Sequence, residues 1–115
     1  MKQIHTFIAE PSVMVRQMVA NTVMKMSDVV VGGTSDLASW ERTFRQIVET
    51  EPNVLVLGVD ELESASGTLF YKLREQLPEL PIIVVSTRSL EGGRTIIRAL
   101  RSGAVDFVTK PSKHT

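Results

Sequence analysis

Residues 53–62 read NVLVLGVDEL. Within this stretch Val54 to Leu57 form an unbroken apolar run, without the alternation of a strand that has one face in water. Such a run is typical of a central strand in a parallel sheet, which is covered on both faces. The run ends at Gly58 and passes into an acidic loop that contains Asp60. The stretch therefore predicts a buried central strand that delivers no side chain at its carboxyl end.

The segments on either side alternate between strand and helix patterns. Further strands are expected in 4–8, 28–31, 81–86 and 104–111, and helices in 10–26, 35–48, 64–80 and 89–100, with GGTS at 32–35 as a turn. Four helices between five strands predict an α/β doubly wound sheet in the order 2-1-3-4-5.

Several residues should mark where the helices begin and end. The candidate N-caps are Ser12 or Glu10 for the first helix, Ser35 or Asp36 for the second and Ser89 for the fourth. Gly92 and Gly93 weaken the first turn of the fourth helix by about 1 kcal/mol each relative to alanine. Apolar spacing predicts that Val15, Met18, Val23 and Met26 share the inner side of the first helix, and that Leu37, Trp40, Phe44 and Val48 lie on the inner side of the second.

The fifth strand lacks a helix to cover one of its faces, because residues 112–115 are few and polar. A doubly wound sheet normally carries helices on both faces. We expect a single domain, residues 1–115, that forms the N-terminal part of a longer protein and lacks a last covering helix.

Composition excludes several classes of function. The 115 residues include 13 basic and 13 acidic side chains, which gives no overall attraction to nucleic acid. Cysteine is absent, which excludes disulfides and thiolate metal sites. No signal peptide and no apolar run of roughly 18 residues occurs. We expect a cytoplasmic domain that binds neither nucleic acid nor membrane.

A functional crevice is expected beyond the carboxyl ends of the strands, next to the point where strand order reverses. The residues delivered there are Glu10 and Pro11, Gly58 and Asp60, Ser86, and Lys110. The serines lie in no G-x-S-x-G motif, and His5 and His114 have no partners at catalytic or ligand spacing. We therefore expect no enzyme activity in this chain.

Three stretches carry a resemblance to a known family: SGAVDFVTKP at 102–111, EPSVMVR at 10–16 and EPNVLVLG at 51–58. They resemble the receiver domains of two-component response regulators, most of all the type fused to chemotaxis methylesterases. The resemblance runs through the chain to Pro111 and implies a flavodoxin-like fold. It also implies a role in signal transduction, with a protein partner or a fused output domain.

The resemblance also implies roles for the acidic positions. Glu10 matches the first of two metal-binding acids, and Pro11 falls on the second. Gly58 falls on the phosphorylated aspartate. Glycine has no oxygen that can accept a phosphoryl group, and Mg²⁺ prefers carboxylate oxygens. We therefore expect no cofactor and no Mg²⁺ site.

The remaining pocket positions match better. By resemblance, Ser86 is the hydroxyl that closes on the phosphoryl group, Phe107 the aromatic side chain that turns with it, and Lys110 the phosphate-binding lysine. The bond between Lys110 and Pro111 matches one that is cis in the family, which costs little before proline. Without metal or phosphate, Glu10 and Lys110 could form a direct ion pair; the sequence leaves this open.

Three hypotheses of function follow. The first is a degenerate receiver that regulates through protein contacts. The second is a receiver that accepts phosphate on Asp60 and regulates a fused methylesterase, although a solvent-facing loop acid is the simpler interpretation of Asp60. The third is a flavodoxin-like nucleotide binder, for which GGTS lacks the lysine of a phosphate loop.

A partner surface is expected on the fourth helix. Arg94, Arg98 and Arg101 are spaced to share one outer face, which could dock an acidic protein or remain a solvated face. A homodimer through this helix and the fifth strand is a further possibility. Trp40 and Phe44, four residues apart, are expected to pack in the core rather than to form a ligand platform.

Overall fold

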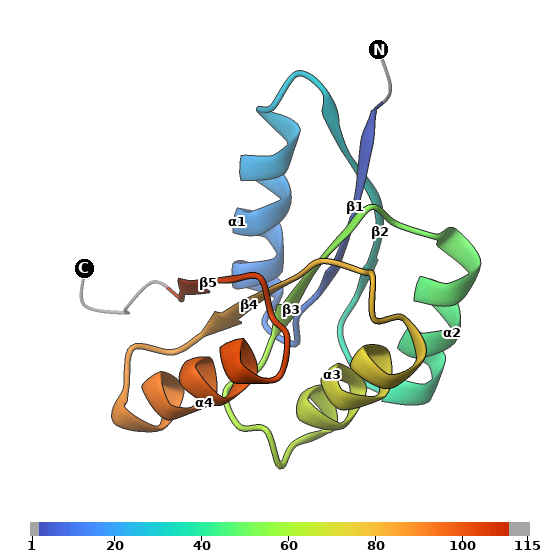
Figure 1. Ribbon diagram of the computed structural model, residues 1–115. Helices are drawn as coiled ribbons and strands as arrows, with labels where there is room; N and C mark the ends of the chain where they lie inside the picture. Colours follow the sequence, from blue (N-terminus) through green and yellow to red (C-terminus); the bar gives the residue numbers. More distant parts are fainter. Residues whose placement is uncertain (1–2, 111–115) are drawn as a thin grey trace.

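Five parallel strands form one sheet in the computed structural model, which describes residues 3–110 (Figure 1). The strands are β1 Ile4–Ala9, β2 Val29–Ser35, β3 Val54–Gly58, β4 Ile82–Ser86 and β5 Asp106–Thr109. Their order is β2-β1-β3-β4-β5, which confirms the order expected from the sequence. Every pair of neighbouring strands is parallel, so all carboxyl ends meet at one edge.

Each helix begins directly after a serine. The helices are α1 Val13–Met24, α2 Trp40–Thr50, α3 Ala65–Gln76 and α4 Leu90–Arg101, and their N-caps are Ser12, Ser39, Ser64 and Ser89. Each serine hydroxyl accepts a hydrogen bond from the backbone N–H three residues later, which satisfies a donor that has no partner inside the helix. The expected caps Ser12 and Ser89 are thereby confirmed.

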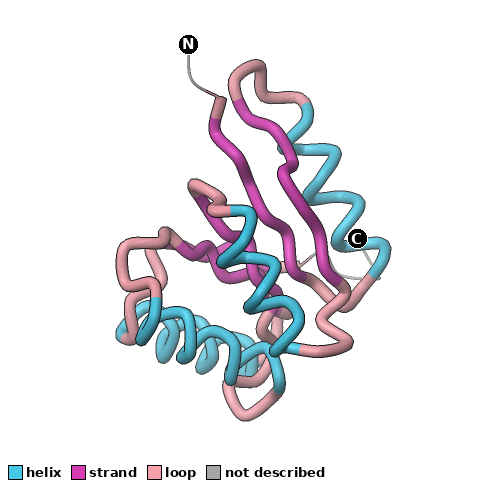
Figure 2. The backbone as a smooth tube through the Cα atoms, turned by 90° about the vertical axis from the view of Figure 1, so that its right-hand side faces the viewer, coloured by secondary structure: helices cyan, strands magenta, loops and turns pink. Residues whose placement is uncertain are grey.

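The core lies on both faces of β3, as its apolar run predicted. Leu55 and Leu57 are buried toward α2, α3 and α4, whereas Val56 packs with Val15 of α1 on the opposite face. Figure 2 shows this division, with α1 alone on one side of the sheet. Trp40 and Phe44 pack against the larger cluster, which confirms their expected place in the core.

The expectation of a turn at GGTS was wrong. The strand β2 continues through Gly32 and Gly33 to Ser35, with an irregular register opposite β1, and α2 begins only at Trp40. A side chain at Gly33 would lie 2.8 Å from the ring of Phe7, so the glycine permits the strand to pass this buried ring. Ser35 caps no helix; its hydroxyl instead accepts from the N–H of Leu37 and bonds to the hydroxyl of Thr43.

Two faces are more exposed than the helical patterns indicated. Leu37 is buried, but from a loop position with φ of 62°, and Val48 is exposed. On α1, Val15 and Val23 are buried, whereas Met18 is exposed, as is Met26, which lies just past the end of the helix; both methionines border a cavity of about 450 Å³ next to β4 and β5. In the described part of the chain only α1 covers this face of the sheet, and no helix there could span a membrane.

A single arginine holds the connection from α3 to β4. The guanidinium of Arg74 donates hydrogen bonds to the backbone carbonyls of Leu77, Pro78, Leu80 and Gly103. Burial lowers the pKa of this guanidinium from its ordinary value. Gly103, just after α4, adopts a φ of 110° that side-chain-bearing residues rarely adopt.

The two glycines of α4 have different surroundings. A Cβ added at Gly92 would lie 2.9 Å from Thr87 Oγ1 and closer still to the Thr87 carbonyl oxygen. A Cβ at Gly93 would meet nothing within 4 Å. Only Gly92 is therefore required by packing.

Candidate functional site

The end of β1 places a buried carboxylate in the crevice. Glu10 directly follows β1 and its side chain is only 2% exposed. The N–H of Ser12 donates to Glu10 Oε2 at 2.6 Å, and Arg16 donates to the Glu10 carbonyl at 2.7 Å. The chain turns from strand to helix here, so the helix start itself fixes the position of this carboxylate.

The space above Gly58 is filled by that carboxylate. A Cβ built on Gly58 would lie 2.8 Å from Glu10 Cδ and closer still to Glu10 Oε1. Carbon and oxygen atoms that are not bonded do not approach so closely, so a side chain at position 58 requires Glu10 to move. The central strand thus delivers no side chain, and a neighbouring strand supplies the group that occupies the space.

Lys110 pairs with two carboxylates. Its Nζ lies 2.9 Å from Glu10 Oε1 and 3.1 Å from Asp60 Oδ2, and its side chain is only 11% exposed. Of these two contacts of Lys110, only the one with Asp60 has hydrogen-bond geometry. Burial alone lowers the pKa of Lys110 and is the largest single influence, but the two carboxylates outweigh it and hold that pKa above its ordinary value. The direct pair with Glu10, which the sequence left open, is present.

Asp60 is not the solvent-facing loop acid that the sequence favoured. Its side chain is half-exposed, but Oδ1 accepts from the N–H of Thr87 at 3.1 Å and Oδ2 accepts from Lys110. Its carbonyl oxygen accepts from Thr95 Oγ1 at 2.8 Å. The Asp60 carboxylate thus points toward donors that follow β4 and β5. Its hydrogen bond with Thr87 joins the loop after β3 to the loop after β4.

The other expected pocket residues occupy the ends of β4 and β5. Ser86 ends β4 and is fully buried, and within residues 3–110 its hydroxyl has no hydrogen-bond partner. Phe107 is 43% exposed and pairs by its backbone with Val84 of β4. The bond between Lys110 and Pro111 lies outside the described residues, as does His114.

A cavity of about 300 Å³ opens at this edge of the sheet. It is lined by Pro11, Gly58, Asp60, Glu61, Ser64, Ser66 and Lys110. Pro11 offers no side-chain oxygen, and the ammonium of Lys110 contacts the one buried carboxylate. Residues 3–110 contain no group of three acids, histidines or cysteines that could hold a metal ion.

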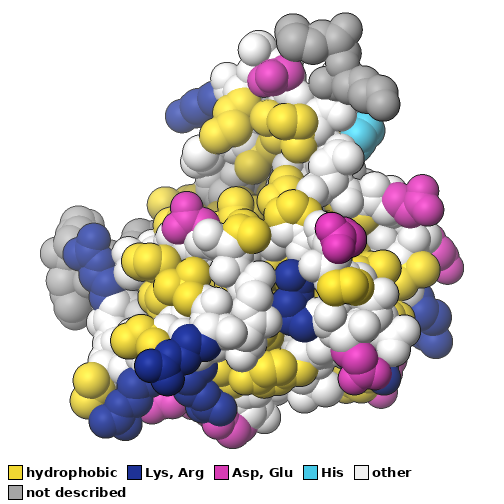
Figure 3. Space-filling model, in the orientation of Figure 1, with side chains coloured by type: hydrophobic (Ala, Val, Ile, Leu, Met, Phe, Trp, Pro, Cys, Tyr) yellow, Lys and Arg dark blue, Asp and Glu magenta, His cyan; other side chains and the backbone are white. Residues whose placement is uncertain are grey.

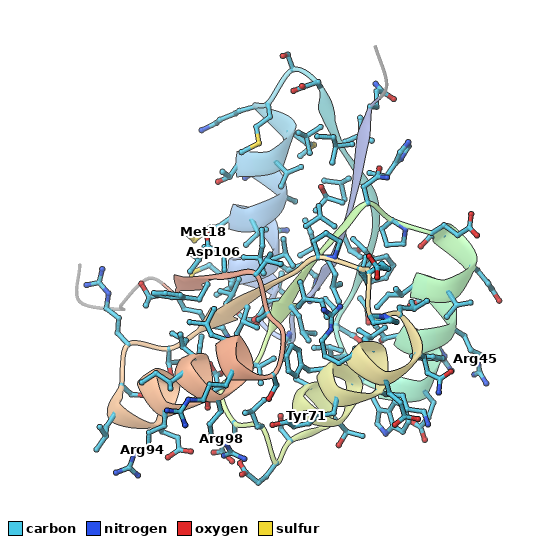
Figure 4. All side chains as sticks on the ribbon, in the orientation of Figure 1. Met18, Arg45, Tyr71, Arg94, Arg98 and Asp106 are labelled. Atoms are coloured by element: carbon cyan, nitrogen blue, oxygen red, sulfur yellow. The ribbon has the colours of Figure 1, made fainter. Side chains whose placement is uncertain are left out.

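The three arginines of α4, Arg94, Arg98 and Arg101, differ in their ion pairs. Figure 3 shows Lys and Arg side chains gathered over this helix. Arg98 donates to Glu63 at 2.9 Å, and this pair raises the pKa of Arg98 and lowers that of Glu63. Figure 4 shows Arg94 pointing away from the sheet. Arg94 and Arg101 make no ion pair in the described part of the chain.

Thr95 is a site residue that sequence reasoning missed. It is buried on the inner side of α4, four residues before the buried Ala99, and contacts Asp60 across 35 residues of chain. The signal was a hydroxyl on an apolar helix face, where a buried polar group requires a partner. The sequence did not reveal which backbone carbonyl the hydroxyl would find.

The chain is similar in sequence to one part of several methylesterases. No family model matches it. It is 35% identical over 112 residues to a protein-glutamate methylesterase/protein-glutamine glutaminase of Hydrogenovibrio crunogenus, and 33% identical over 113 residues to one of Nitrosomonas europaea. Each match covers 96% of this chain but only 29% and 30% of the relative. The chain thus spans less than a third of the length of these relatives.

Solved structures confirm the fold. The response regulator domain of Thermotoga maritima CheB superposes with a TM-score of 0.80 at 24% identity, over 96% of this chain and 80% of that one. The signal receiver domain of the putative response regulator NarL from Mycobacterium tuberculosis gives 0.79 at 17% identity, over 98% and 88%. Both neighbours share the fold of this chain, which is the flavodoxin-like fold that the resemblance implied.

Proposed function

We propose that this chain, which is a response-regulator receiver domain, works as a regulatory protein-interaction module without conventional aspartyl phosphorylation. One observation carries the proposal: β3 ends in Gly58, and the space above it holds the Glu10 carboxylate. A phosphoryl group needs a nucleophilic oxygen at the place where it is received. Glycine supplies none, and Glu10 is engaged by Ser12 and Lys110.

The crevice also does not offer the free carboxylates that usually hold Mg²⁺ in phosphoryl-transfer sites. Mg²⁺ in phosphoryl-transfer sites is held by one or two carboxylates together with phosphate oxygens and water. Here Pro11 replaces one acid, and Lys110 neutralises the other. We expect neither Mg²⁺ nor another cofactor to take part.

Intact-mass spectrometry after incubation with acetyl phosphate and Mg²⁺ tests the proposal. We expect no gain of about 80 Da, the mass of one phosphoryl group, while a phosphorylatable receiver treated in parallel gains it. A gain on the wild type that Asp60→Asn abolishes would favour the rival function, in which Asp60 is the acceptor. A gain at any aspartate overturns the proposal.

We propose that the domain regulates its partner by direct binding through α4. The exposed Arg94 and Arg101 offer positive charge on α4, and Ile97 and Leu100 add exposed apolar surface on the same helix. A surface of this chemistry complements an acidic protein segment with apolar side chains. The methylesterase relatives make a fused methylesterase domain the leading candidate for the regulated partner. The chain itself is proposed to carry no catalysis.

A further inference from the structure

A second cavity lies at the opposite end of the sheet from the crevice, where β3 and β4 begin. It has a volume of about 560 Å³ and is lined by residues 47–48, 51–53 and 76–81, which belong to the ends of α2 and α3 and to the segments that lead into β3 and β4. We call it the α2–α3 groove. Its volume lies within the range of about 300–1,000 Å³ that is usual for binding pockets.

Apolar side chains line part of this groove. Ile47 is fully buried and Leu80 is 9% exposed, whereas Val48 is 44% exposed. The helical pattern predicted Val48 on the inner side of α2, yet the structure leaves nearly half of this side chain open beside the groove. Covering such surface with another apolar side chain favours binding.

The charged side chains that line the groove are all acidic. Glu51 and Glu79 are both exposed, and no lining residue is basic. Neither glutamate forms an ion pair within residues 3–110. The last turn of α2 contains no basic residue, so nothing in that turn offsets the negative end of its dipole. Figure 3 shows acidic side chains beside apolar ones over α2 and α3.

The groove offers an anion few backbone donors. Three of its lining residues are prolines, which have no N–H: Pro52, Pro78 and Pro81. The N–H groups of four further lining residues already donate to backbone carbonyls: Glu51, Asn53, Leu77 and Leu80. The groove therefore favours a positively charged group over a negatively charged one.

We propose that the α2–α3 groove docks a segment of a partner protein that presents an apolar side chain next to a lysine or arginine. The apolar side chain covers Val48, and the cation lies between Glu51 and Glu79. This surface is separate from α4 and from the crevice, so the inference goes beyond the proposed function and does not depend on Gly58. It gives the domain a second contact, of opposite charge to the first.

NMR titration with two capped tripeptides tests the inference on the chain itself. The probe is acetyl-Arg-Leu-Arg-amide, and the matched control is acetyl-Glu-Leu-Glu-amide. We expect the basic peptide to shift the amide signals of Val48, Asn53 and Leu80 and to bind at least about fivefold more tightly than the acidic one. Equal affinity for the two peptides overturns the inference, as do shifts that are confined to α4 or to the crevice.

Three variants separate the charged from the apolar contribution. Glu79→Gln should weaken binding of the basic peptide about fivefold, and Val48→Ser should weaken it about threefold. Both side chains are exposed, so neither replacement disturbs the core. Glu41→Gln is the control, because this exposed glutamate lies at the other end of α2 and should leave binding unchanged. An effect of Glu41→Gln as large as that of Glu79→Gln overturns the inference.

Sedimentation of the chain alone distinguishes a separate partner from a second copy. The α4 surface, with Arg94, Arg101 and Leu100, has chemistry that a second copy could present to the groove. We expect the chain to remain a monomer at the concentration of the titration. Association that Glu79→Gln abolishes would make a second copy the occupant and would overturn the proposal of a separate partner.

Discussion

Replacing Gly58 by alanine should destabilise the fold through Glu10. The added Cβ would lie 2.8 Å from Glu10 Cδ and closer still to Oε1, so the carboxylate must leave its place. The glutamate side chain is flexible, but its carboxylate is buried and held by the N–H of Ser12 at 2.6 Å and by Lys110 at 2.9 Å. The cost therefore comes from breaking these two polar interactions, rather than from moving the backbone.

The two interactions set the magnitude. A hydrogen bond to a charged group contributes about 1.5–3 kcal/mol to the free energy of unfolding. Lys110 keeps its second carboxylate, Asp60, so the loss on that side is small. Alanine in a strand is favoured over glycine by about 0.5–1 kcal/mol, because the unfolded chain loses less entropy. We expect Gly58→Ala to lower the free energy of unfolding by about 1–2 kcal/mol.

A double-mutant cycle measured by urea denaturation provides the assay. Glu10→Ala removes the obstructing carboxylate, so Gly58→Ala made in that background should raise stability by about 0.5–1 kcal/mol instead of lowering it. The change of sign is the decisive result. If Gly58→Ala costs the same in both backgrounds, Glu10 does not fill the space above Gly58 and the reasoning fails.

Three further predictions concern other parts of the molecule. Gly92→Ala should destabilise by more than about 1 kcal/mol because its Cβ meets the preceding loop, whereas Gly93→Ala should stabilise by about 0.5–1 kcal/mol; equal effects in urea denaturation would contradict the difference in packing. The pKa of Lys110 is raised in the fold, so its contribution to stability is complete below the ordinary value of 10.5 and is lost as pH rises through the higher folded value. The free energy of unfolding measured between about pH 9 and 12 should fall less steeply in Lys110→Met, and identical slopes would refute this. Arg74→Met should cost about 2–3 kcal/mol, because it removes donors from four carbonyls, while exposed Arg45→Met stays within about 0.5 kcal/mol; thermal unfolding that does not separate the two would contradict the role of Arg74.

The sequence predicted the sheet well because its signals are local. The apolar run at 54–57 identified a central strand without reference to any other segment, and Ser89 indicated a helix start by its position alone. The GGTS segment failed because glycine commonly marks a turn, whereas here Gly33 yields space to the ring of Phe7, a residue of another strand. A contact between strands that are distant in sequence leaves no local pattern.

The crevice was predictable as a set of residues but not as a set of interactions. The strand ends identified Glu10, Asp60 and Lys110 as neighbours, and the structure brings all three together. The orientation of Asp60 was beyond the sequence, because it depends on a backbone N–H 27 residues away and on an ammonium 50 residues away. Side-chain orientation on a loop is set by such distant donors rather than by the residues beside it.

The filled space above Gly58 couples two positions that lie 48 residues apart in the sequence. An aspartate placed at position 58 would meet the Glu10 side chain, so this replacement should lower stability. Glu10 would have to move aside or be exchanged as well. Positions 10 and 58 are thus coupled, and the effect of a substitution at either position on stability depends on the residue at the other.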